Sequence, residues 1–95
     1  MNDFKVYSIF FLSSDLNAFM EVIRSNYPSK VVADNFILIY TNDDTKEIYE
    51  KIEAHVNRTL ITEIGGTFRG KLVADVWEWL DGKAGKMEYG DNYKG

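Results

Sequence analysis

The chain of 95 residues contains no cysteine, which excludes a disulfide framework, a zinc ribbon and a thiol nucleophile together. Long apolar runs are also missing, because stretches such as Ile9–Leu12 are far shorter than the roughly 20 residues that a membrane-spanning helix needs. The segment Met1–Phe4 lacks the basic start and following apolar stretch of a secretory signal. Together these absences predict a cytoplasmic protein with no membrane segment.

Basic charge is scarce and scattered. Eleven Lys and Arg residues face fifteen Asp and Glu residues, which gives a net charge of −4. Binding to a phosphate backbone requires clustered Lys and Arg, so the acidic monomer is not expected to bind nucleic acid. An acidic excess usually serves solubility; the alternative is that it mimics nucleic acid and occupies a basic groove of another protein.

The sequence also lacks a recognisable catalytic constellation. His55 is the only histidine, and Gly65–Gly70 does not have the Lys-Ser/Thr ending of a phosphate-binding loop. Asp43 and Asp44 could ligate a metal, but their position before a helix predicts capping. Asp15 is the one acid near the end of the first expected strand, which makes it the alternative catalytic residue. We therefore expect no cofactor and no metal.

Apolar periodicity divides the chain into regular elements. Strands are predicted at 4–12, 30–33, 36–41 and 59–64, and helices at 16–27, 45–56 and 71–80. Asp34 and Asn35 suit the tight hairpin between the second and third strands. The order β-α-β-β-α-β predicts an α+β, ferredoxin-like fold with a four-stranded antiparallel sheet plus a C-terminal helix. Residues 1–80 would form this single domain, and 81–95 a flexible Gly-rich tail.

Each expected helix has an identifiable apolar stripe. The first is Leu16, Phe19, Met20, Ile23 and Tyr27. Asp44 and Glu47 form a predicted capping box for the second helix, in which Lys51 is expected to pair with Glu47 four residues earlier. In the last helix, Trp77 belongs to the apolar stripe and Trp79 lies away from it.

The two crossover helices cover only one face of the expected sheet. The other face must be covered by the C-terminal helix, by a second subunit or by a ligand, and a body of this size favours a homodimer. Trp79 is the first candidate for an interface, because tryptophan is enriched at interface hot spots. Phe68 and Arg69 in the Gly-rich loop, and Tyr89 in the tail, are the other candidate binding residues.

Three segments resemble a known family, the SinR-like small proteins. The segment Phe36–Ile48 resembles their "W-L-V-x-S-D-x-S-A-E-E-I" pattern, Leu60–Ile64 their "L-F-V-x-E-I" strand and Lys71–Leu80 their closing "G-W-L-x-x-x-x-W-x-W-[IL]" helix. With Phe4–Leu12 as the opening strand, the similarity covers about residues 4–80. The family is distantly related to CRISPR-associated endoribonuclease-fold subunits, so the resemblance implies a ferredoxin-like fold that often forms dimers.

The same resemblance argues against catalysis. Nuclease relatives carry an aspartate at the end of the first strand in a "Y-D" setting, whereas the matching stretch here, Tyr7–Leu12, contains no acid. The nearest carboxylate, Asp15, lies beyond the strand.

The sequence therefore predicts a non-catalytic binding module with a protein partner. By analogy with small acidic chains of phages and mobile elements, it could antagonise a host defence system. The alternatives are a metal-dependent endonuclease that uses Asp15, and a sensor of a small ligand or nucleotide.

Overall fold

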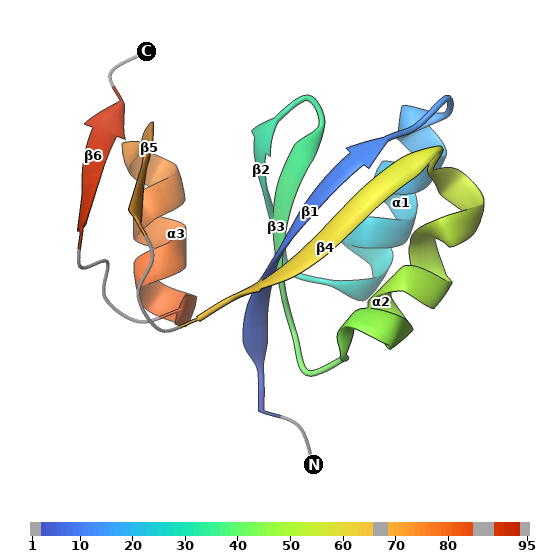
Figure 1. Ribbon diagram of the computed structural model, residues 1–95, viewed down its shortest axis with the longest axis horizontal. Coiled ribbons are helices and arrows are strands. Elements are labelled where there is room, and N and C mark those ends of the chain that lie inside the picture. Colours follow the sequence, from blue (N-terminus) through green and yellow to red (C-terminus); the bar gives the residue numbers. More distant parts are fainter. Residues whose placement is uncertain (1–2, 66–68, 85–88, 94–95) are drawn as a thin grey trace.

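The computed structural model describes residues 3–65, 69–84 and 89–93. It shows an α+β fold built on a four-stranded antiparallel sheet (Figure 1). The elements follow the order β1 (Lys5–Leu12), α1 (Leu16–Asn26), β2 (Ser29–Ala33), β3 (Phe36–Thr41), α2 (Thr45–Ile52), η1 (Glu53–His55), β4 (Arg58–Ile64), β5 (Arg69–Val73), α3 (Ala74–Ala84) and β6 (Tyr89–Tyr93). The strand order in the main sheet is β2-β3-β1-β4, which leaves β2 and β4 at its two edges.

Local sequence signals explain the first part of the chain. Asp34 and Asn35 form the two-residue turn between β2 and β3, as predicted, and the register of that hairpin shifts at a bulge between Val31 and Ala33. Asp15 caps α1 by accepting the backbone N–H of Ala18 at 3.1 Å. The α1 stripe is buried as expected except at Leu16, which lies at the exposed first turn.

The first core lies between one face of the sheet and the pair α1 and α2, which lie together on that side (Figure 1). Alternate residues of the central strands supply its floor, because successive side chains of a strand point to opposite faces. Its buried members are Tyr7, Ile9, Phe11, Phe19, Met20, Ile23, Tyr27, Ile37, Ile39, Ile48 and Ile52.

The second core is smaller and lies on the opposite face of the sheet. Val6 and Leu38 contribute from β1 and β3, and Val76, Trp77 and Leu80 contribute from α3. Lys30 of β2 and Asp75 at the start of α3 form an ion pair of 2.7 Å, which joins the helix to the sheet edge. The core positions predicted for Ile52 and Trp77 are confirmed.

The last third of the chain differs from the prediction. Residues 71–73, expected to open a helix, belong to β5, and α3 runs instead from Ala74 to Ala84. The segment 81–95, for which the sequence predicts no regular structure, contains the last turn of α3 and strand β6, which pairs with β5 in parallel. A parallel pair needs a crossover connection of about a dozen residues, usually helical, and α3 provides it.

We predict that Ile52→Ala and Trp77→Ala each lower the free energy of unfolding by about 2–5 kcal/mol, as large-to-small core changes do. His55→Ala should cost less than about 1 kcal/mol, because the half-buried His55 bonds to Ser13 only through its backbone carbonyl. Urea titration of the three variants measures these differences. A larger loss for His55→Ala than for either core variant would contradict the assignment of the two cores.

Candidate functional site: the uncovered half of the sheet

Asp15, the one acid considered for catalysis, is occupied as a helix cap. The Asp15 carboxylate accepts the Ala18 N–H, and the backbone N–H of Asp15 donates to the Ser13 hydroxyl at 3.2 Å. That hydroxyl donates in turn to the His55 carbonyl. Among the described residues, no three His, Asp or Glu side chains come together as a group that could hold a metal ion.

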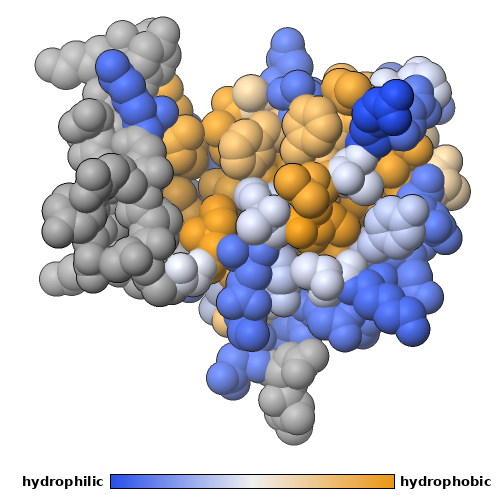
Figure 2. Space-filling view, viewed as in Figure 1, coloured by the Kyte–Doolittle hydropathy of each residue, from blue (hydrophilic) through white to orange (hydrophobic). Residues whose placement is uncertain are grey.

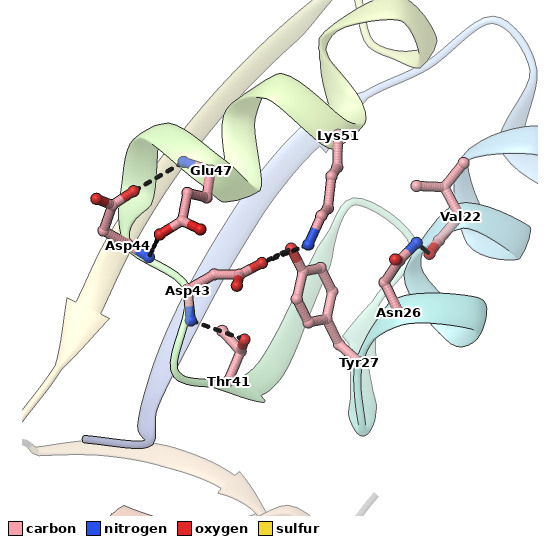
Figure 3. A network of polar contacts seen from close by, with 8 residues as sticks. All are labelled: Val22, Asn26, Tyr27, Thr41, Asp43, Asp44, Glu47 and Lys51. Carbon is pink, nitrogen blue, oxygen red and sulfur yellow. Dashed lines mark hydrogen bonds and ion pairs between the residues drawn. The ribbon is translucent and has the colours of Figure 1, made fainter. Parts of the chain in front are cut away.

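The strongest polar cluster lies where β3 passes into α2 (Figure 3). Asp44 and Glu47 form the predicted capping box, in which each side chain accepts the backbone N–H of the other residue. Lys51 does not pair with Glu47 as expected. Its ammonium lies 2.5 Å from Asp43 Oδ2, because the carboxylate of Glu47 is turned back toward the helix start.

Tyr27, at the end of α1, completes this cluster. Its hydroxyl donates to Asp43 Oδ2 at 2.8 Å, and Lys51 Nζ lies 5.1 Å from its ring centroid. Burial and the hydrogen bond to Asp43 raise the pKa of Tyr27 to about 12. The hydrogen bonds from Lys51 and Tyr27 lower the pKa of Asp43, and the bond to Asp43 raises the pKa of Lys51.

The contacts among Tyr27, Asp43 and Lys51 fasten α1 and α2 to one end of the sheet. Sequence reasoning missed this contact; the only signal was Asp43 itself, an acid next to the helix cap whose role the capping box did not explain.

The most unusual surface is the part of the second sheet face that α3 leaves uncovered. Phe10 and Leu12 of β1 and Leu60 of β4 point to this face and are 39%, 43% and 65% exposed. Phe10 lies between Phe36 of β3 and Leu60 in the strand register, so the three form one row across the sheet. Figure 2 looks onto this side and shows apolar side chains gathered over the strands.

One polar side chain on this surface is already bonded within the sheet. The Ser8 hydroxyl donates to the Thr62 carbonyl at 3.4 Å. Arg58, opposite Leu12 in the register, is the one charged residue among these positions. We call Phe10, Leu12, Phe36 and Leu60 the uncovered patch. It can make apolar contacts, and it offers no chemistry for bond making or breaking.

Of the predicted binding residues, Trp79 has a described side chain, and it lies away from the uncovered patch. Trp79 is half-buried against the second core, with Lys83 Nζ 4.6 Å from its ring and 5.9 Å from that of Tyr40. Phe68 lies outside the described residues. Arg69 opens β5 and Tyr89 opens β6, but their side chains lie outside the description.

Two shallow grooves flank the sheet. One, of about 340 Å³, lies between α2 and the edge strand β4, where Lys46 and Tyr49 face Leu60 and Ile61. The other, of about 200 Å³, lies between α1 and the opposite edge, with Leu16 and Val31 on its rim. Cavities that enclose drug-sized ligands usually measure about 300–1,000 Å³ and bury most of the ligand, which these open grooves do not.

Comparison of the chain with protein-family models, with curated proteins and with solved structures gives no match. None of the described helices is long and apolar enough to span a membrane.

We predict that stability falls at alkaline pH because of Tyr27. Its folded-state pKa of about 12 lies above the ordinary value of 10.0, so the unfolded chain loses this proton first as the pH rises. The free energy of unfolding should decrease between pH 10 and pH 12 more steeply in the natural protein than in Tyr27→Phe. Denaturant titrations at several pH values measure both slopes. Equal slopes would show that the hydroxyl is not held in this way.

Proposed function

We propose that this chain is a non-catalytic, ferredoxin-like module that works by binding another protein through the uncovered patch. The observation that carries the proposal is the row Phe36, Phe10 and Leu60, which lies on a sheet face that α3 covers only in part. Contiguous exposed apolar surface on a small protein marks an interaction site more often than it marks chance.

The arrangement of the elements supports the ferredoxin-like assignment. A helix follows β1 and another follows β3, and the antiparallel order β2-β3-β1-β4 places the first and third strands at the centre. The resemblance of Phe36–Ile48 and Leu60–Ile64 to SinR-like proteins agrees with it, and we propose kinship with that group. The role of an antagonist of a host defence system, encoded by a phage or mobile element, is part of the same proposal.

The chemistry of the patch favours a protein over a nucleic acid. An RNA-binding sheet also displays aromatic side chains, but it needs Lys and Arg nearby to neutralise phosphates. Here Arg58 stands alone beside Phe10 and Leu12, on a chain with a net charge of −4. The fit is better to an apolar protein surface, for which exposed Phe and Leu side chains provide the buried centre of an interface.

We predict that Phe10→Ser abolishes capture of the partner from the source cell while the fold is retained. Phe10 is already 39% exposed, so the substitution should lower the affinity for the partner more than it lowers the free energy of unfolding. Val31→Ser is the matched control, because Val31 is 52% exposed on the opposite edge strand. Quantitative pull-down with circular dichroism measures both. A partner that is retained by Phe10→Ser and lost by Val31→Ser would place the binding surface elsewhere.

The endonuclease is the second candidate, and it depends on Asp15. Because Asp15 serves as a helix cap, we predict no magnesium-dependent cleavage of RNA or DNA, and partner binding unaffected by Asp15→Asn or by excess chelator. Asparagine keeps a side-chain oxygen that caps the helix, so the variant should fold. Cleavage that requires magnesium and disappears in Asp15→Asn would establish the nuclease instead.

A further inference from the structure

We infer that β4 pairs with β4 of a second copy of this chain, which joins two sheets into one sheet of eight strands. The inference goes beyond the proposed function, because it concerns the outer edge of β4 and leaves the uncovered patch exposed on one face of the joined sheet. It depends on three features: a strand edge with which no described strand pairs, an apolar row that ends at that edge, and a charge pattern on the neighbouring helix.

The two edges of the sheet are not alike. The β2 edge is five residues long, directly follows Pro28 and contains the bulge between Val31 and Ala33, while its Lys30 is held by Asp75. Short length, proline, bulges and lysine are the devices by which proteins protect an edge from pairing. The β4 edge is seven residues long and pairs with β1 in continuous register, without proline or bulge. Of the two, β4 is the unprotected edge.

Symmetry restricts how two β4 strands can meet. A two-fold axis normal to the sheet makes the strands antiparallel and keeps each face continuous, so facing residues must share a face. A register centred on Leu60, the most exposed apolar residue of the strand, places it against its own copy and joins the two rows of Phe36, Phe10 and Leu60. In that register Arg58 faces Thr62 and Glu63 faces Asn57, so no like charges are opposed.

The helix beside this edge has a complementary pattern. Thr45, Lys46 and Tyr49 border the groove along Thr59, Leu60 and Ile61, and Glu53 continues the stripe one turn further. The same axis makes the two copies of α2 antiparallel, with the 45%-exposed Tyr49 near the centre. Lys46 of each copy then lies toward Glu53 of the other. The axis thus gives two Lys46–Glu53 pairs of opposite charge, which favours a second copy of this chain over a strand of another protein.

The first test measures mass by light scattering over the micromolar range. The natural chain should give about 22 kDa, twice its 11.0 kDa. Leu60→Lys places two ammonium groups at the axis and should weaken dimerisation by about tenfold or more. Val31→Lys makes the same change on the β2 edge and should leave the dimer intact. A monomeric natural chain, or dissociation by Val31→Lys but not Leu60→Lys, overturns the inference.

The second test reverses the charges on α2. Lys46→Glu and Glu53→Lys each oppose like charges across the axis and should weaken the dimer, whereas the double variant K46E/E53K should restore it. Both side chains are exposed, so the fold is retained in all three, which circular dichroism checks. A double variant no tighter than the singles contradicts the proposed placement of α2.

The two proposals fail separately. A monomer that still captures a partner in a Phe10-dependent manner overturns the β4 pairing and leaves the protein-binding proposal standing. A dimer that dissociates in Leu60→Lys but captures no partner protein supports the β4 pairing and overturns the protein-binding proposal.

Discussion

The structure depends on covering the two apolar faces of one four-stranded sheet with a chain of 95 residues. Two amphipathic helices, α1 and α2, cover most of the first face, and the buried members of that core are at most 8% exposed, whereas Val31 at the β2 edge of the same face is 52% exposed. On the second face, the eleven-residue helix α3 and the β5 residues Leu72 and Val73 pack around Val6 and Leu38, while Phe10 and Leu60 stay exposed. Among the described helices, none covers the uncovered patch.

The central strand β3 shows how this constraint operates. Its residues Ile37 and Ile39 enter the first core, while Leu38 enters the second, so the strand is buried on both sides near its middle. Toward its start, Phe36 is partly buried against the second core and lies beside the exposed Phe10 in the strand register. The contacts among Tyr27, Asp43 and Lys51 hold the C-terminal end of β3, where α1 and α2 meet the sheet. The side chains that could have carried chemistry are thus used to hold the first layer in place.

Periodicity was sufficient to predict the elements up to residue 64. The α1 stripe, the Asp34–Asn35 turn and the capping box of Asp44 are confirmed because each depends on residues close in sequence. The start of α3 was predicted wrongly, since Leu72 and Val73 suit a strand as well as a helix stripe, and the choice is made by pairing with β6. The Tyr27–Asp43–Lys51 contact and the uncovered patch could not be predicted, because both depend on how separate elements dock.

We infer that the outer edge of β4, with which no described strand pairs, is the part of the sheet that meets a second copy of the chain. Hydrogen exchange of backbone amides at low and high protein concentration tests this most directly. The claim predicts that amides within Arg58–Ile64 exchange more slowly as the concentration rises, while those within Ser29–Ala33, at the other edge, exchange at a constant rate. Exchange in β4 that is independent of concentration, or protection that appears in β2 instead, would contradict it.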